Sequence, residues 1–548
     1  MSETSADRGP AVAEKQTAPA LETGRIDAPV LHRLAGNAAV AEGSALLEVE
    51  APFTGETLGA VPCGTAQDMI AACAAARAAQ QQWAAASFAE RAAILLRFHD
   101  LLLANANEVL DLIQLEIGKA RVHAFAEVLD TAITARYYAH TAERFLASHR
   151  RQGALPLLTS TREVLHPRGV IGFITPWNFP LILSITDALA ALMAGNAAVI
   201  KPDSQTPFTC LWAAALLREA GLPDGVLQVV PGAGAEIGQP LIDNVDYLMF
   251  TGSTATGTRL AQAAAARLID YSMELGGKNA AIVLDDAPRG FKAGKDCLGI
   301  CSERGVAFGI SAHAGQVCIS CERLFVQDGI YDSFMAALIE TMGGLRIGSG
   351  LSWDCDVGSL ASADQLAKVQ AHVDEAVERG ARVLIGGRAR PDLGPYFFEP
   401  TLLEGVSEDM TLCRTETFGP VASVYRFTSV DDAIERINDC AYGLNASVWT
   451  ADHRKGVQIA ARIEAGTVGV NDAYQATWAS SGSPMGGYKT SGVGRRHGRQ
   501  GIVKYTEAQT IAVQRLSPVE SIPFLDNRGY ATVMTAAIKL LKYLPGID

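Results

Sequence analysis

The chain has 548 residues, of which 49% are hydrophobic and 19% charged, a composition typical of a folded protein with roughly two to four domains. Its formal net charge of −13 argues against a nucleic-acid partner, because no positive field attracts phosphate. The first ten residues lack the apolar core of a secretory signal and the ten cysteines show no regular pairing, so we expect reduced thiols and a cytoplasmic location.

The first part of the chain alternates between helical and strand-like patterns. Residues 1–45 are alanine-rich, polar and aperiodic, which predicts a disordered N-terminal tail. Helical spacing follows at 66–84, 89–104, 121–149 and 209–220. Short, wholly apolar runs, typical of strands, occur at 170–174, 197–200, 227–230 and 247–250. Because strands covered on both faces are apolar throughout, the alternation predicts a parallel sheet between helices.

The longest apolar stretch, residues 179–200, is interrupted by Asp187 and by Gly195-Asn196. We interpret it as a buried helix followed by a buried strand and expect no membrane span.

The second half of the chain shows the same alternation of apolar strand-like runs and helical segments, which predicts a second α/β domain. The expected strands are 323–326, 381–384, 421–424 and 447–449, and the expected helices include 331–342 and 363–379. Two further extended segments, 150–168 and 506–516, fall outside either sheet. They could pair with each other or with another subunit, because unpaired strand edges need partners.

Three residues could together carry covalent acyl transfer. Cys318 follows Ala-Gly-Gln-Val and could be a nucleophile, Glu274 could be a general base, and the Asn178 amide could stabilise an oxyanion. Each has a plainer interpretation: an inert buried thiol, a surface carboxylate and a turn-forming amide.

Eight motifs, in this order, resemble the aldehyde dehydrogenase superfamily over about residues 45–515. They are Pro176-Trp-Asn-Phe-Pro180, Ala194-Gly-Asn196, Lys201-Pro202, Phe250-Thr-Gly-Ser-Thr254 with Gly257, Glu274-Leu-Gly-Gly-Lys278, Gly315-Gln-Val-Cys318, Glu416-Thr-Phe-Gly-Pro420, and Pro484-Met-Gly-Gly-Tyr-Lys489 with Ser491-Gly492. Within that superfamily the wording resembles bacterial succinate-semialdehyde dehydrogenases.

The resemblance implies an aldehyde dehydrogenase-like α/β fold with two parallel-sheet domains and a small β oligomerisation arm. The expected division is a tail at 1–45, a dinucleotide-binding domain at 46–149 and 168–276, an arm at 150–167 and 500–517, a catalytic domain at 277–499 and an extension at 518–548. Because the extended segments 150–168 and 506–516 leave strand edges that need partners, we expect a homodimer or homotetramer.

The resemblance also implies NAD(P)+-dependent oxidation of an aldehyde to a carboxylic acid. Cys318 would form a thiohemiacetal and then a thioester, Asn178 would hold the oxyanion, and Glu274 would activate the hydrolytic water. No metal ligands are expected. The residues expected to bind NADP or NAD are Trp177, Lys201, Ser204, Gly252, Ser253, Gly257, Glu416 and Phe418.

The position three residues after Lys201 bears on cofactor choice. Members that prefer NAD often carry a glutamate there, which accepts from the ribose 2′-hydroxyl; this chain has Ser204. Serine does not repel a 2′-phosphate, and Lys201 could pair with one. We therefore expect NADP to be accepted, and it could be the preferred cofactor. The direction of Asp203 is left open.

Several features depart from the family pattern. The interval from Glu274 to Cys318 is longer by about ten residues, about three helical turns, near residues 293–306, which predicts a longer surface helix or an added loop. His313 is interpreted as a helix-surface histidine. Cys321, three residues after Cys318, leaves a reversible disulfide open. Residues 533–544 form an amphipathic stripe that we expect to pack on the same subunit or on a partner.

The substrate is less determined than the chemistry. Arginines that bind a substrate carboxylate in better-known members would fall near Thr186 and Ala312, where this chain has none. Either Arg495 or Arg496 substitutes, or the aldehyde has no carboxylate.

Two other classes of function stay open. The chain could be a thiol acyl-transferase, an esterase or a CoA-acylating relative that uses Cys318 differently, or a catalytically silent binding protein. The presence of Cys318, Glu274 and Asn178 together argues against both.

Overall fold

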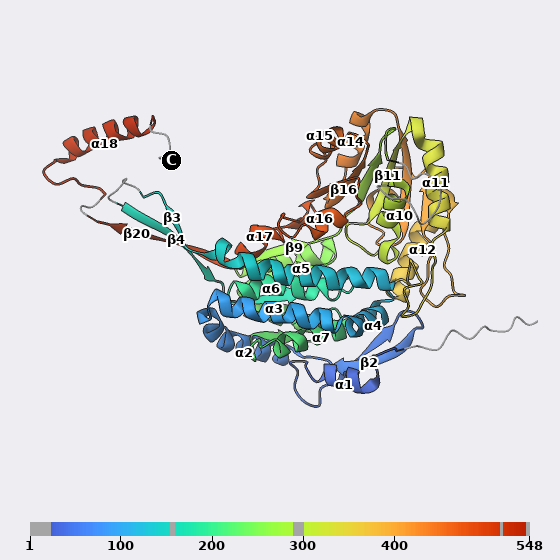
Figure 1. Ribbon diagram of the computed structural model, residues 1–548, viewed down its shortest axis with the longest axis horizontal. Helices are drawn as coiled ribbons and strands as arrows, with labels where there is room; N and C mark the ends of the chain where they lie inside the picture. The colour runs from blue at the N-terminus through green and yellow to red at the C-terminus, as the bar shows by residue number, and fades with distance from the viewer. Residues whose placement is uncertain (1–22, 154–158, 289–300, 516–518, 544–548) are drawn as a thin grey trace, which may run out of the picture.

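The computed structural model describes residues 23–153, 159–288, 301–515 and 519–543. Figure 1 shows two sheet-containing bodies side by side, with a narrow antiparallel arm extending away from them. The strands are β1 (Leu46–Ala51), β2 (Glu56–Pro62), β3 (His149–Arg151), β4 (Thr159–Pro167), β5 (Val170–Ile174), β6 (Ala197–Lys201), β7 (Leu227–Val229), β8 (Tyr247–Thr251), β9 (Asp270–Glu274), β10 (Asn279–Val283), β11 (Cys321–Gln327), β12 (Arg382–Ile385), β13 (Thr401–Glu404), β14 (Val421–Phe427), β15 (Tyr442–Gly443), β16 (Asn445–Trp449), β17 (Thr467–Val470), β18 (Tyr488–Lys489), β19 (Gly492–Val493) and β20 (Thr506–Gln514).

The helices surround these sheets. They are α1 (Ala28–Ala35), α2 (Ala66–Ala85), α3 (Phe88–Ala104), α4 (Ala106–Ile117), α5 (Arg121–Leu146), α6 (Ile182–Met193), α7 (Pro207–Glu219), α8 (Gly234–Asn244), α9 (Thr254–Ala266), α10 (Ser302–Ser311), α11 (Tyr331–Gly343), α12 (Ala363–Glu378), α13 (Thr411–Arg414), α14 (Val430–Asn438), α15 (His453–Ala460), α16 (Gln475–Ala479), α17 (Gly498–Val503) and α18 (Asn527–Leu541), with 3-10 turns η1 (Ala312–Gly315) and η2 (Asp328–Ile330).

Local sequence explains several helix ends. Helices α2 and α3 each begin with a capping box, in which two side chains each accept from the other residue's backbone N–H. The pairs are Thr65 with Asp68 in α2 and Ser87 with Glu90 in α3. Helix α4 ends at Gly118, whose φ of 68° suits glycine.

The first large sheet has six strands in the order β19-β9-β8-β5-β6-β7. All neighbours are parallel except β19, which pairs antiparallel with β9. Side chains alternate between its faces: Ile171 and Phe173 join a core with α6 and α7, whereas Val170 and Val199 join a core with α2 and α8. The sheet is therefore covered on both sides, as the apolar runs predicted.

The second large sheet has seven strands in the order β12-β13-β14-β11-β10-β16-β17, with only β12 antiparallel to its neighbour. One face packs on α10 and α11 through Ile310 and Phe334, and the other on α14 and α15 through Ile434 and Ile459. Two mostly parallel α/β sheets confirm the predicted fold class; each is mixed rather than purely parallel, because one edge strand runs against the rest.

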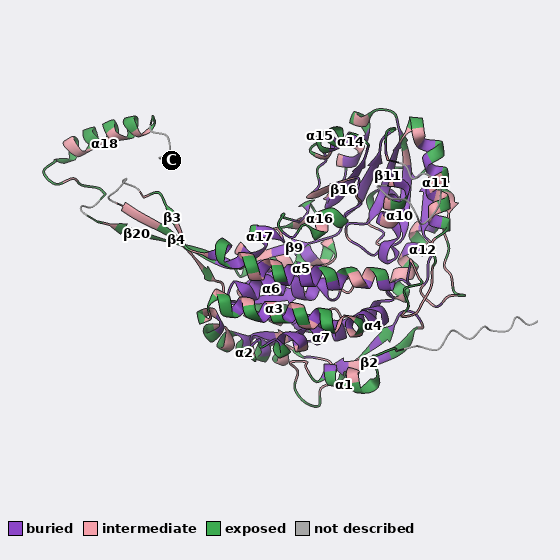
Figure 2. Ribbon diagram, in the orientation of Figure 1, coloured by how far each residue is buried: buried purple, intermediate pink, exposed green. Residues whose placement is uncertain are grey.

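The two extended segments do pair with each other. Strand β20 lies antiparallel to β4 along its whole length, and β3 pairs with the other edge of β4. In Figure 2 this arm is almost entirely exposed or intermediate, in contrast to the buried strands of the two bodies. Residues 154–158 and 516–518 lie outside the described residues.

The prediction of a disordered tail at residues 1–45 is wrong for residues 28–35. Asp27 caps α1, a proline occupies its first turn, and Leu31 and Leu34 are buried beneath it. The helix has only eight residues, too few for its apolar spacing to stand out in an alanine-rich segment. Residues 1–22 lie outside the described residues.

The insertion is also placed differently from the prediction. Residues 302–306 begin α10, where Ser302, Glu303 and Val306 are buried, so this part is a core helix and not a surface one. The remainder, 293–300, lies outside the described residues. At the other end, α18 has no buried residue, and the expected packing of its apolar stripe is not seen within the described subunit.

Among the helices that the structure describes, none combines the length and the apolar character needed to cross a bilayer. The stretch 179–200 contains α6 and β6, as predicted, and both elements are buried throughout.

Candidate active site

The site lies where the two sheets face each other. Five strands of the six-stranded sheet are parallel, so the segments that follow β5, β6, β8 and β9 meet at one edge. Asn178, Ser204 and Ser253 follow the first three of these strands, and Glu274 ends the fourth. Cys318 comes from the other body, just before β11. Tertiary structure thus brings together residues that are far apart in the sequence.

A strained turn carries the chain toward Cys318. His313 and Ala314 have φ values of 50° and 51°, and Gly315 has 69°. Non-glycine residues rarely adopt this region, which costs about 1–3 kcal/mol each. A side chain at Gly315 would overlap the Gly419 carbonyl, so the turn packs directly against the segment that carries Phe418.

Two buried amides fix the Cys318 segment. The Asn279 Nδ2 donates to the main-chain carbonyls of Cys318 and Ser320, both at 2.8 Å. Gln316 accepts from the Ala361 backbone N–H at 2.8 Å through Oε1 and donates to the His313 and Ser359 carbonyls through Nε2. Neither Asn279 nor Gln316 was assigned a role from sequence. Their position beside the Gly-Gly-Lys and Val-Cys motifs is the signal that could have identified them.

Asn178 is positioned by a buried ion pair. Lys119 Nζ lies 2.5 Å from Glu127 Oε1 and donates to the Asn178 main-chain carbonyl at 2.8 Å. Glu127 in turn accepts from the Leu181 and Ile182 backbone N–H groups at the start of α6. One hydrogen of the Asn178 side-chain amide goes to the Gln316 carbonyl at 3.0 Å, which leaves its second hydrogen as a donor.

Glu274 is a buried carboxyl with a free oxygen. Its Oε1 has no hydrogen-bond partner in the described chain. A Cβ at Gly486 would lie 2.9 Å from that oxygen, so glycine leaves space there. Burial raises the pKa of Glu274 to about 7, against the opposing charges of Arg496 and Lys504. A carboxyl that titrates near neutral pH suits general base catalysis.

The Cys318 thiol is protonated at neutral pH. Burial, with the nearby carboxyls of Glu274 and Glu416, raises the pKa of Cys318 to about 12. A thiol in this state needs a base to become a nucleophile. Cys321 is the first residue of β11, and both thiols are free. The redox switch between them stays a prediction.

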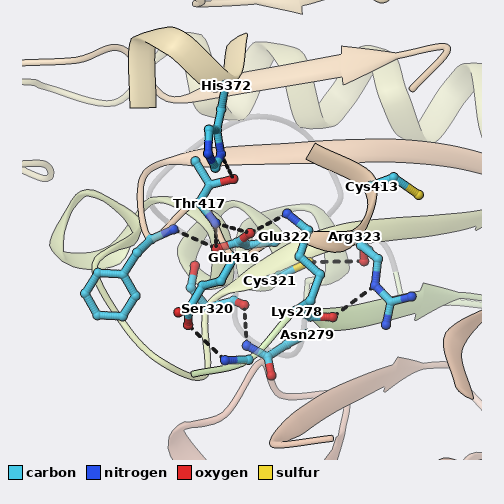
Figure 3. A network of polar contacts seen from close by, with 12 residues as sticks. Lys278, Asn279, Ser320, Cys321, Glu322, Arg323, His372, Cys413, Glu416 and Thr417 are labelled. Carbon is cyan, nitrogen blue, oxygen red and sulfur yellow. Dashed lines mark hydrogen bonds and ion pairs between the residues drawn. The ribbon is translucent and has the colours of Figure 1, made fainter. Parts of the chain in front are cut away.

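Glu322 joins three segments of the site (Figure 3). It pairs with Lys278 at 2.5 Å between Nζ and Oε2, and it accepts from the backbone N–H groups of Thr417 and Phe418 at 2.9 Å. Next to it, Glu416 accepts from the Gly277 N–H at 2.8 Å. A side chain at Gly276 would overlap the Glu416 carboxylate. Glu322 was not identified from sequence, because its role depends on segments about a hundred residues away.

Most of the residues predicted for the dinucleotide follow strands of the six-stranded sheet, whereas Glu416 and Phe418 come from the loop before β14 in the other body. Ser253 caps α9 by accepting from the Thr256 N–H. Lys201 is buried and donates to the Pro202 carbonyl at 2.6 Å, and burial lowers its pKa while Asp203 opposes that. Trp177 and Phe418 stack edge to face with ring centroids 5.4 Å apart. Ser204 and Gly252 lie after β6 and β8.

These residues fit a dinucleotide. The first N–H groups of α9 lack intrahelical acceptors and lie beside the Ser253 hydroxyl, which suits a pyrophosphate. The Lys201 ammonium suits a ribose or its phosphate, and Glu416 a ribose hydroxyl. Gly257 has a separate structural reason: a Cβ there would lie 2.5 Å from the Leu275 side chain.

Asp203 is now placed. Its carboxylate accepts from the Gln205 N–H at 3.0 Å, and its charge interacts with Lys201. Burial raises the pKa of Asp203, and the charge of Lys201 opposes that rise.

A cavity of about 220 Å³ opens onto Cys318. His313 lines it and is buried, so the interpretation of His313 as a surface residue is wrong: the left-handed turn directs it inward. Burial and the Lys119 charge hold the pKa of His313 well below its usual value.

Comparisons with known proteins agree with this geometry. Residues 39–511 match the family model described as the aldehyde dehydrogenase family. A Mycolicibacterium smegmatis protein is 48% identical over 91% of this chain and 94% of its own length, and a Mycobacterium tuberculosis H37Rv protein is 45% identical over 90% and 95%. Both carry the provisional name of an NADP(+) succinate-semialdehyde dehydrogenase.

Solved structures give the same result. An Escherichia coli enzyme described as NADP-dependent superposes with a TM-score of 0.81 at 35% identity, covering 87% of this chain and 96% of that one. A Bacillus cereus aldehyde dehydrogenase in complex with NAD+ has a TM-score of 0.80 at 34% identity, covering 87% and 94%.

The Lys278–Glu322 pair generates a stability prediction. Replacing Glu322 by Gln keeps the shape but leaves a buried ammonium without its counter-charge, which costs about 3–5 kcal/mol. We expect a lower melting temperature and weaker dinucleotide binding, measured by calorimetry and by tryptophan fluorescence. Glu404→Gln removes the carboxylate of an exposed pair with Arg382 and is the matched control. Equal effects of the two variants would contradict the assignment.

Proposed function

The chain belongs to the aldehyde dehydrogenase family and is an NAD(P)+-dependent aldehyde dehydrogenase, and from that premise we propose that Cys318, Glu274 and Asn178 carry the reaction. The observation that supports this most is the electrostatic interaction between two buried groups of one site. They are the protonated Cys318 thiol and the Glu274 carboxyl, which has a pKa of about 7 and one free oxygen.

In the first half-reaction the Cys318 sulfur adds to the aldehyde carbon. The thiol proton leaves to the Glu274 carboxylate, because the thiol does not ionise by itself at neutral pH. The oxygen that becomes negative accepts from the free hydrogen of the Asn178 amide and from the Cys318 backbone N–H. The product is a thiohemiacetal on Cys318.

In the second half-reaction the thiohemiacetal becomes a thioester, and water hydrolyses it. Bound NAD(P)+ supplies the hydride acceptor for this oxidation. Glu274 first releases the thiol proton to solvent and then takes a proton from the attacking water, and the tetrahedral oxyanion again lies at Asn178. Collapse expels the Cys318 thiolate, which is reprotonated, and releases the carboxylic acid.

For the dinucleotide we propose the residues along the sheet edge. Gly252 and Ser253 at the start of α9, with Gly257 in its first turn, would hold the pyrophosphate. Lys201 and Ser204 would face the adenosine ribose, and Glu416 the nicotinamide ribose. Trp177 and Phe418 would line the pocket.

The substrate, the assembly and the location are further proposals. The names of the relatives that are 45–48% identical support succinate semialdehyde as a candidate substrate. The long, exposed β20 edge supports a homodimer or homotetramer, whose mass light scattering would give. Nine free cysteines in the described residues support a reducing compartment, the cytoplasm.

Cys318→Ala tests the nucleophile. We expect loss of aldehyde oxidation with unchanged dinucleotide affinity, because only the covalent step is removed. Reduced-cofactor fluorescence and direct binding measure the two. Cys210→Ala, in buried helix α7, controls for loss of a buried thiol. Near-normal turnover of Cys318→Ala would overturn the mechanism.

Glu274→Gln tests the base. In the wild type we expect activity to fall as pH decreases through about 7, because protonated Glu274 cannot accept a proton. The variant should lose this dependence together with both the burst of reduced cofactor and the steady-state turnover, because Glu274 accepts a proton in each half-reaction. Stopped-flow fluorescence separates the two phases; a retained burst followed by slow turnover would restrict Glu274 to activation of the hydrolytic water.

Ser204→Glu tests cofactor choice. With serine present, NADP should match or exceed NAD in kcat/KM, and a carboxylate there should shift preference toward NAD by about ten- to a hundred-fold, the value of one charge-assisted hydrogen bond. If wild type strongly prefers NAD and Ser204→Glu changes nothing, Asp203 sets the choice, and Asp203→Asn should then move it.

A further inference from the structure

The cavity above Cys318 has an almost wholly apolar wall. Its described lining includes aromatic, aliphatic and a few polar side chains: Phe179, Phe308, Tyr474, Trp478, Leu129, Ile133, Ile182, Leu183, Val317, Ile319, Ala126, Ala312, Ala479, His123, Asp130, His313, Gln475 and Cys318. None of these is a lysine or an arginine. A substrate with a terminal carboxylate would therefore meet no cationic partner on this wall.

The cations nearest to the wall are engaged elsewhere. Arg496 forms a buried ion pair with Asp187, and its guanidinium lies over the Trp478 ring, 5.2 Å from the centroid. Lys119 pairs with Glu127. Arg495 donates to the Gly487 and Gly494 carbonyls. The earlier hypothesis that Arg495 or Arg496 receives a substrate carboxylate thus has no support from the lining.

The two histidines add no positive charge. Burial and the neighbouring Lys119 lower the pKa of His123 to about 4 and hold that of His313 well below its usual value. Both are therefore neutral at physiological pH, and the His123 Nδ1 accepts from the His313 backbone N–H at 3.1 Å.

Asp130 is the one acidic group among the residues that line the cavity. It lies on α5, is 5% exposed, and neither carboxyl oxygen accepts a hydrogen bond of standard geometry within the described chain. Burial raises the pKa of Asp130 to about 7, although Arg496 and the Trp478 side chain lower it in part. A buried, unsatisfied acceptor costs about 1–3 kcal/mol, which a ligand donor would recover.

We propose that this cavity selects aldehydes with an uncharged, apolar body that carries a hydroxyl group able to donate to Asp130, and that it rejects aldehydes with a terminal carboxylate. This substrate class rests on the proposed function of Cys318, because the aldehyde must reach that thiol. An apolar cavity of about 150 Å³ is large enough for benzene, so about 220 Å³ is enough for a hydroxybenzaldehyde.

A cationic aldehyde fits less well. Two of the four aromatic rings on the wall already carry a cation, since Lys119 lies 3.7 Å from the Phe179 centroid and Arg496 lies over Trp478. These two positive charges behind the aromatic wall would oppose a third.

The first test compares substrates on the wild-type enzyme. We would measure kcat/KM by reduced-cofactor fluorescence for succinate semialdehyde, butanal, benzaldehyde and the three hydroxybenzaldehydes. We expect benzaldehyde and butanal to exceed succinate semialdehyde by about a hundred-fold, the value of one unpaired charge kept out of water at roughly 3 kcal/mol. At least one hydroxybenzaldehyde should exceed benzaldehyde by about ten-fold.

The second test changes Asp130. Asp130→Leu should abolish the preference for hydroxybenzaldehyde over benzaldehyde, measured as the ratio of the two kcat/KM values. Asp130→Asn keeps an acceptor oxygen and should retain part of that preference, while it improves use of succinate semialdehyde because the acidic group is gone. Asp374→Asn, at an exposed position of α12, is the matched control, and melting temperatures would confirm folding.

The results distinguish a failure of the proposed function from a failure of the inference about the cavity. If no aldehyde reduces the cofactor, the proposed function fails. If aldehydes are oxidised but succinate semialdehyde is the best substrate, or if Asp130→Leu leaves the hydroxyl preference unchanged, only the inference about the cavity is overturned. The wild-type comparison does not depend on any variant folding.

Discussion

The buried pair of Lys278 and Glu322 is the interaction on which the rest of the site depends. The two side chains are 0% and 3% exposed, so their charges are stable only together and with further hydrogen bonds. Glu322 obtains these bonds from Thr417 and Phe418, which ties the segment after β9, the start of β11 and the loop before β14 to one point. Glu274, Cys318 and Glu416 each lie within a few residues of that point.

Burial then sets the protonation state of the reactive groups. The same low-dielectric surroundings raise the pKa of the Cys318 thiol to about 12 and that of Glu274 to about 7. In water the thiol would lose its proton more readily and the carboxyl would be a weaker base. Inside this site they are coupled: a neutral nucleophile adjoins a group that can accept its proton near neutral pH.

Asn178 depends on a second buried pair, Lys119 with Glu127, which fixes both its main chain and the start of α6. Lys119 also depresses the pKa of the cavity histidines. One ion pair therefore positions the amide expected to stabilise the oxyanion and, together with burial, keeps the two cavity histidines neutral. The names of the relatives refer to succinate semialdehyde, whereas we propose an apolar aldehyde for the cavity above Cys318. The chemistry shared by the family and the choice of substrate therefore depend on different residues.

The sequence by itself determined the class of fold and the family, and it predicted the chemistry-bearing residues. A wholly apolar run indicates a strand that is buried on both faces, and the run 170–174 coincides with β5. The Gly-Gln-Val-Cys and Glu-Leu-Gly-Gly-Lys motifs are contiguous in the sequence and can be read from it directly. Only tertiary structure decided that His313 points inward, that α1 is ordered, that Glu322 joins three segments and that Asp130 faces a cavity. These properties depend on which distant segments exclude water from a side chain, and no local pattern along the chain encodes that.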